Sequence, residues 1–283
     1  MIFLNGITPL PPNYSRHRNS PTRKKTKATG SDMETLSINL TIPKSWNELD
    51  DKQLRYSYSL IANDFSLDEI KTLALLKWSG CKVVVQSKDG GFIIKNGKDI
   101  FQIITNQIAE LLPFLYWLDN LPQSPVCLGR IRNRNSVASD FQGVPFETFL
   151  IVENLYQGFL TTKQDTMLDE IAHVLYPGLK AQLSSEERIS IFYWIAALKN
   201  MFAKRFSDFF QPVNAASENM LGTSPDIGER LQESMNAQIR ALTKGDITKE
   251  REILSLDTWR ALTELNAQAK EYKQINAQIN AKK

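Results

Sequence analysis

The segment 186–206 constrains the fold of this chain more than any other. Its apolar residues would cover most of the circumference of a helix: Ile189, Ile191, Phe192, Trp194, Ile195, Leu198, Met201, Phe202 and Phe206. Just before it, Ser184 and Glu187 have the spacing of a capping box, in which two side chains satisfy backbone N–H groups at a helix start. A helix that is apolar nearly all round has to be buried. We therefore expect this helix at the centre of a bundle or in an interface.

Helical patterns occupy most of the remaining chain. Ser45 with Glu48 and Ser66 with Glu69 repeat the capping-box spacing. Together with the C-cap residue Gly80 they predict a helical hairpin over 45–80. A proline inside a helix removes a hydrogen bond, so Pro113 is expected to kink the helix that contains it. Further helices are expected over 105–118, 146–160, 165–176 and 229–243, and from 248 towards the end.

Between residues 82 and 104 the period of the pattern changes. The β-branched run Val83–Val85 and the runs 92–95 and 99–103 are separated by Asp89-Gly90 and Asn96-Gly97. Such dipeptides between apolar runs are typical of hairpin turns. The predicted fold class is therefore mainly α, a helical bundle with a small antiparallel β-meander near residues 82–104.

Composition shifts and breaker residues divide the sequence into six regions. We predict a disordered basic tail (1–32), a helical hairpin with the β-meander and a helix (33–120), a loop (121–145), a helical core (146–210), a linker (211–228) and C-terminal helices (229–283).

The net charge of the chain is concentrated in the first region. Of the 34 lysines and arginines, six lie in residues 1–32, against one of the 31 acids, Asp32, so the rest of the chain is close to neutral. The segment is also poor in apolar residues, which predicts disorder. Three interpretations stay open: a basic arm that contacts nucleic acid or an acidic partner, a translation start at Met33, or an inert tail.

Few residues of this sequence suit catalysis or metal binding. The two cysteines, Cys81 and Cys127, form no CxxC motif, which argues against a disulfide framework and a zinc site. His173 is accompanied by no nucleophile motif, and we interpret it as a structural residue. No cofactor, no metal and no enzymatic activity are predicted. No apolar run approaches the roughly 20 residues that span a bilayer, so we expect a cytoplasmic protein.

Arginines alternate in the predicted loop at Arg130, Arg132 and Arg134, and no acid occurs between Asp119 and Asp140. In an extended segment, alternate side chains project to the same side. Such a row could contact a nucleic-acid backbone. It could equally contact an acidic protein surface or remain solvated, and these alternatives stay open.

The last predicted helix carries an amphipathic seam. Its apolar residues recur at steps of three and four, the pattern of a helix that packs against a partner helix. We predict partner-binding contacts at Trp259, Leu262, Leu265, Tyr272 and Ile275.

Three stretches carry a resemblance to a group of known proteins. They are 42–49 (IPKSWNEL), 140–158 (beginning DFQGVPF and ending ENLYQG) and 257–262 (DTWRAL). They resemble uncharacterised proteins encoded in prophages and mobile elements of Bacteroidetes-type bacteria. The plan of a helical body with a helical tail is similar to that of phage tail-assembly chaperones.

This resemblance implies a function but no catalytic residues. It implies a non-enzymatic phage or prophage assembly protein in the bacterial host cytoplasm, which binds a virion or tail structural protein through helical surfaces. The C-terminal helix and the segment 186–206 would supply the contacts. The alternative is nucleic-acid binding through Arg130, Arg132, Arg134 and the basic tail. Homo-oligomerisation is compatible with either hypothesis.

Overall fold

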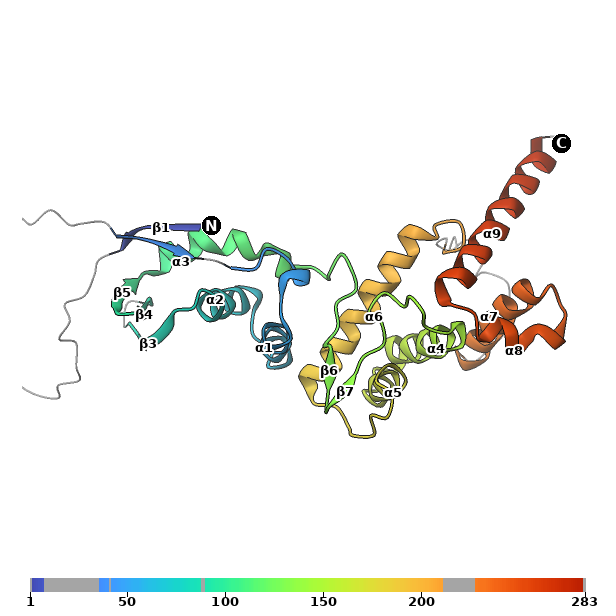
Figure 1. Cartoon of the computed structure of the whole chain (residues 1–283). Coiled ribbons are helices and arrows are strands. Elements are labelled where there is room, and N and C mark those ends of the chain that lie inside the picture. The colour runs from blue at the N-terminus through green and yellow to red at the C-terminus, as the bar shows by residue number, and fades with distance from the viewer. Residues whose placement is uncertain (1, 8–35, 41, 88–89, 211–226, 282–283) are drawn as a thin grey trace, which may run out of the picture. The chain divides into compact units, whose positions relative to one another are not determined.

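The computed structural model describes residues 2–7, 36–40, 42–87, 90–210 and 227–281. The described chain is mainly helical, with a small three-stranded antiparallel sheet, which confirms the predicted fold class (Figure 1). The α-helices are α1 (Asp51–Ala62), α2 (Leu67–Trp78), α3 (Thr105–Leu111), α4 (Phe146–Thr162), α5 (Thr166–Leu175), α6 (Ser185–Arg205), α7 (Ile227–Thr243), α8 (Glu250–Leu254) and α9 (Thr258–Ala281). The strands are β1 (Ile2–Ile7), β2 (Leu36–Leu40), β3 (Lys82–Gln86), β4 (Phe92–Asn96), β5 (Asp99–Ile103), β6 (Arg130–Ile131) and β7 (Arg134–Asn135). The 3₁₀ helices are η1 (Trp46–Glu48), η2 (Leu112–Asp119) and η4 (Ile247–Lys249).

The chain divides into two compact units. Unit 1 comprises Met1–Leu49 and Asn63–Asn120, and unit 2 comprises Asp50–Ala62 and Leu121–Lys283. The predicted hairpin over 45–80 is therefore wrong as a single packing unit, because α1 belongs to unit 2 and α2 to unit 1. Both helices have the expected type, but sequence periodicity does not reveal which partner an apolar face packs against.

The prediction that residues 1–32 lie outside the fold is wrong for residues 2–7. These residues form β1, which pairs antiparallel with β2 and brings Ile2 opposite Leu40. The polar, basic composition that predicted disorder begins only after this strand. The remaining tail prediction concerns residues 8–32, which lie outside the described residues.

Unit 1 contains the predicted meander. Its strand order is β3-β4-β5, and the turn between β4 and β5 places Gly97 at a positive φ of 60°. Helix α2 packs against η2, where the rings of Trp78 and Trp117 stack at 6.0 Å between centroids. Pro113 ends regular α-helix, and the chain continues as the 3₁₀ helix η2. The proline thus changes the type of helix where the sequence predicted a kink.

Of the three predicted capping boxes, the one at Ser66 with Glu69 is complete. At Ser184 only one half is made: its backbone N–H donates to the side chain of Glu187 at 3.0 Å, while its hydroxyl makes no hydrogen bond to a described residue. At the third position Ser45 makes no side-chain cap, and only the short η1 follows it. Helix α1 instead starts after a reciprocal pair that the sequence analysis missed. The backbone N–H of Gln53 donates to Asp50, and the backbone N–H of Asp50 donates to the Gln53 side chain.

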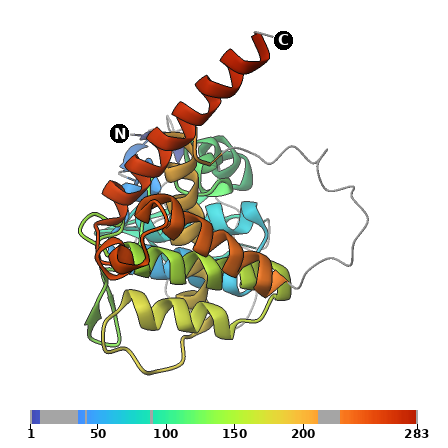
Figure 2. The same ribbon diagram turned by 90° about the vertical axis from the view of Figure 1, so that its right-hand side faces the viewer.

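Helix α6 is the centre of unit 2, as its apolar circumference predicted. Trp194 is fully buried, and its indole N–H donates to the carbonyl of Ser139 at 2.6 Å. Helix α1 packs on one side of α6 through the ring pair Tyr58–Tyr193, at 5.6 Å. Helices α4 and α5 lie side by side and also belong to this body (Figure 2).

The C-terminal region contains more elements than the sequence analysis separated. Helix α7 agrees with the predicted 229–243 segment, but η4 and α8 precede α9, and the chain turns at Ser255 before α9 begins at Thr258. Most of the predicted linker, residues 211–226, lies outside the described residues. Among the described residues, no helix combines the length and apolar character needed to cross a membrane.

Candidate protein-binding surfaces

The ends of four helices in unit 2 enclose an open groove of about 520 Å³. We call it the α6 groove. It is lined by Ile61 and Ala62 of α1, Phe159 and Leu160 of α4, Leu168 of α5, and Ile189, Phe192 and Tyr193 of α6, with Lys163, Asp165, Ser185 and Arg188 at its polar positions. These segments are far apart in the sequence and meet only because α1, α4 and α5 all gather around α6.

Aromatic side chains give the α6 groove a fixed floor. Phe192 lies 5.9 Å from Tyr156 in a stacked arrangement and 5.9 Å from Phe159 edge-on, measured between ring centroids. Burial raises the pKa of Tyr193, which reflects how closely the neighbouring side chains surround its ring. Such contacts hold the rings in place, so the floor is preformed.

The polar rim of the α6 groove carries two cationic side chains, Arg188 and Lys163. They differ in whether a carboxylate of the described chain pairs with them. Arg188 donates two hydrogen bonds to Asp169, at 2.9 and 2.8 Å, and also contacts Asp165 at 3.5 Å. Lys163 takes part in none of the described ion pairs, and its ammonium group lies 5.9 Å from the Phe159 ring centroid. A ligand with an acidic group beside an apolar stripe would match this rim.

The predicted partner-binding seam on α9 is divided by the structure. Leu262 and Leu265 are buried inside unit 2, and Trp259 packs edge-on against Phe202 while its N–H donates to the Asp140 carbonyl. These three residues serve the protein's own core.

The two remaining seam residues, Tyr272 and Ile275, are 68% and 55% exposed, and Ile279, one turn further on, is 50% exposed. Figures 1 and 2 both show this end of α9 projecting beyond the other helices of unit 2.

The predicted arginine loop is a β-hairpin. Arg132 and Asn133 form its two-residue turn with positive φ values of 46° and 63°. The three arginines therefore do not project as a row on one strand. A two-residue turn between short strands matches the primed hairpin turns, for which asparagine is one of the favoured residues.

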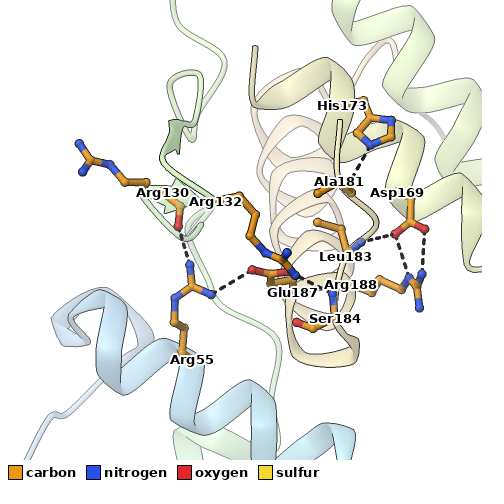
Figure 3. A network of polar contacts seen from close by, with 10 residues as sticks. All are labelled: Arg55, Arg130, Arg132, Asp169, His173, Ala181, Leu183, Ser184, Glu187 and Arg188. Atoms are coloured by element: carbon orange, nitrogen blue, oxygen red, sulfur yellow. Dashed lines mark hydrogen bonds and ion pairs between the residues drawn. The ribbon is translucent and has the colours of Figure 1, made fainter. Parts of the chain in front are cut away.

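Arg130, through its carbonyl, and Arg132, through its side chain, take part in a polar network within unit 2 (Figure 3). Glu187, with its side chain only 6% exposed, pairs with both Arg55 and Arg132. Arg55 also donates to the carbonyl of Arg130, whose own guanidinium donates to the side chain of Asn135.

The guanidinium of Arg134 lies directly over Gly178, where an added Cβ would stand 3.1 Å from its Cζ. Gly178 has a positive φ of 80°, so both the backbone and the arginine favour glycine there. The hairpin arginines thus have structural partners that the sequence could not reveal, and nucleic-acid binding by them stays a hypothesis.

The histidine and the two cysteines considered for chemistry have the following surroundings. Nε2 of His173 lies 3.4 Å from the carbonyl of Ala181 (Figure 3). Its Nδ1 lies 3.7 Å from the carboxylate of Glu170. Cys81 and Cys127 are both free thiols. Within the described part of the chain, no three His, Cys, Asp or Glu residues are grouped so that they could hold a metal ion.

Comparison of the chain with models of protein families, with curated proteins and with solved structures gave no match. Its candidate sites therefore rest on the geometry of this chain alone.

Proposed function

We propose that this protein is a non-enzymatic assembly protein that binds a helical segment of a partner protein in the α6 groove. The single observation that supports this function is the groove itself, an open, aromatic-floored channel bordered by helix ends. Amphipathic helices bind to such grooves by inserting apolar side chains that recur at steps of three and four residues. The chain would act in this way as a phage or prophage assembly protein, in the manner of a tail-assembly chaperone in the bacterial cytoplasm.

The character of the groove defines the partner segment. Its aromatic floor would accept two or three large apolar side chains, each contributing on the order of 1.5–3 kcal/mol when fully buried. Lys163 at the rim favours an acidic residue beside that stripe. A chaperone of this kind would shield the client's apolar helix until a virion subunit replaces it, which requires no chemistry on the bound segment.

The test uses two matched variants of helix α4. Leu160 lines the groove and is 36% exposed, whereas Ile151 lies on the same helix outside the groove and is 38% exposed. We would co-express the chain with the neighbouring genes of its locus and purify wild type, Leu160→Asp and Ile151→Asp. A stoichiometric partner should be retained by wild type and Ile151→Asp and lost by Leu160→Asp, while circular dichroism shows all three folded.

Two results would contradict this proposal. Retention of the partner by folded Leu160→Asp would exclude the groove as the binding site. The absence of any stoichiometric partner with the wild-type chain would count against the assembly function as a whole.

A further inference from the structure

The distal end of α9 carries apolar residues that the other described parts of the chain leave uncovered. Residues seven apart on a helix lie within about 20° of the same direction. Leu265 is buried against unit 2, and Tyr272 and Ile279 continue its direction at seven-residue steps but are exposed. The unpartnered stripe is thus a continuation of a seam that is already packed. Ile275, three residues after Tyr272, widens it.

This stripe has the spacing of a groove-binding helix. Tyr272, Ile275 and Ile279 stand at positions i, i+3 and i+7, the pattern by which amphipathic helices insert into apolar grooves. The end beyond Asn266 is about 15 residues long, and isolated helices of that length are marginal in water. A second surface that covers the stripe would stabilise it.

The chain cannot cover this stripe with its own groove. Helix α9 starts beside the first turn of α4, where the backbone N–H of Thr258 donates to Val144 at 2.9 Å. The groove lies at the other end of α4, around Phe159 and Lys163, which is about 20 Å away along the helix axis. From its start α9 runs outward from unit 2 (Figures 1 and 2). If the distal end of α9 binds in an α6 groove, that groove has to belong to another molecule.

The two surfaces have complementary character. Glu271 directly precedes Tyr272 and borders the exposed stripe, and it takes part in none of the described ion pairs. Lys163, at the rim of the α6 groove, also takes part in none of the described ion pairs. We propose that the distal end of α9 from a second copy of this chain binds in the α6 groove, with Tyr272, Ile275 and Ile279 on the aromatic floor and Glu271 near Lys163.

This inference rests on the proposed function, because it uses the same groove as a helix-binding site. Donor and acceptor are different surfaces, so the contact is heterologous and links copies head to tail into rings or chains. A client helix would compete with α9 for the groove. Self-association would then protect the groove while no client is present, and the client would release it.

The experiment measures the mass of the full chain by sedimentation over a range of concentrations. The donor variant is Ile275→Lys/Ile279→Lys, and its charge-matched control, Gln274→Lys/Ala277→Lys, changes exposed residues on the opposite face of α9. The acceptor variant is Leu160→Asp, with Ile151→Asp as its control. Wild type and both controls should self-associate, whereas each of the two binding variants alone should remain a monomer.

Mixing the two binding variants is the decisive measurement. The donor variant keeps an intact groove and the acceptor variant keeps an intact helix, so an equimolar mixture should form a complex of two chains. A symmetric α9–α9 coiled coil would behave differently, because the acceptor variant would then still dimerise by itself. Dimerisation of the acceptor variant, a monomeric wild type, or a mixture without complex would each overturn the inference.

The client assay separates this inference from the proposed function. The donor variant should still retain the client, because its groove is intact. A monomeric wild type whose client binding depends on Leu160 would overturn self-association and leave the proposed function standing. Client binding that is indifferent to Leu160 would remove the basis of both.

Discussion

The two halves of α9 share one sequence pattern and have different environments. In the first half, Ala261, Leu262 and Leu265 are buried, and Trp259 is held by a hydrogen bond. In the second half, Tyr272, Ile275 and Ile279 continue the apolar seam into solvent. The comparison teaches that an amphipathic stripe shows which face of a helix can pack against another surface. Which part of that face is buried within the chain depends on the helices around it.

The two halves also differ in their hydrogen bonds and ion pairs with the rest of unit 2. The first half begins at a network in which Asp257 accepts hydrogen bonds from the backbone N–H groups of Arg260 and Gly143, at 3.1 and 2.6 Å. Lys273 pairs with Asp208 at 2.7 Å, and no ion pair or hydrogen bond to another element is described beyond it. The first half belongs to the core of unit 2, whereas the apolar side chains of the second half are exposed.

The largest effect is expected from truncating a buried apolar side chain in the first half of α9, with an exposed one in the second half as its comparison. Leu262→Ala removes a fully buried side chain and should lower the free energy of unfolding by about 2–5 kcal/mol. Ile279→Ala removes a comparable side chain that is half exposed, and its effect should stay within about 0.5 kcal/mol in the monomer. Urea unfolding at low protein concentration, where self-association is absent, would measure both. Equal losses would refute the division of α9 into two halves.

The sequence predicted the stripe on α9 but not its division. Steps of three and four residues run through both halves, and only the contacts of the first half with Val144, Phe202 and Phe206 distinguish them. Those residues lie between about 50 and 120 positions away in the sequence. Periodicity is a property of one helix, whereas burial also depends on the elements packed around it.

The α6 groove could not be predicted from the sequence for a related reason. The apolar circumference of α6 correctly predicted a central helix, but nothing in the sequence indicated that Phe192 and Tyr193 would stay half-buried and line a groove. The groove itself forms where the ends of α1 and α4 meet α6, which no local pattern encodes. The arginine hairpin gives a second example, since Glu187, which pairs with Arg132 at 3.6 Å, lies more than 50 residues away from it in the sequence.

Replacing Trp259 by phenylalanine should give the second largest effect. The substitution removes the indole N–H that donates to Asp140 at 2.7 Å and leaves space beside Phe202 and Phe206. One hydrogen bond contributes about 1 kcal/mol, and the smaller ring packs less well, so a loss of about 1–3 kcal/mol is expected. Thermal unfolding would measure it. The matched change Tyr272→Phe in the distal half should leave the melting temperature unchanged, and a comparable loss there would contradict the comparison.

A smaller effect on stability is expected from replacing the N-cap residue of α9, Asp257. Asp257→Ala removes the acceptors for the backbone N–H groups of both Arg260 and Gly143 and should destabilise unit 2 by about 1–2 kcal/mol, the upper part of the range for loss of a helix N-cap. Asp257→Asn keeps only one of the two oxygen acceptors, because the amide nitrogen cannot accept a hydrogen bond, and it should recover about half of the loss. Urea unfolding of both variants tests this. If both substitutions cost the same, the carboxylate would be acting through its charge, and the capping geometry would not be the cause.

The smallest effect is expected at the border between the two halves. Lys273→Ala removes the ion pair with Asp208, whose two side chains are each about one third exposed. Exposed and partly exposed pairs contribute about 0.2–1 kcal/mol, and salt screens them. The loss should therefore shrink when urea unfolding is repeated at 1 M sodium chloride. Lys270→Ala, three residues earlier at an exposed position, should have no effect at either salt concentration. A loss at Lys273 that is large and insensitive to salt would mean that the core of unit 2 extends further along α9, and the border between its covered and uncovered halves would have to move towards the C-terminus.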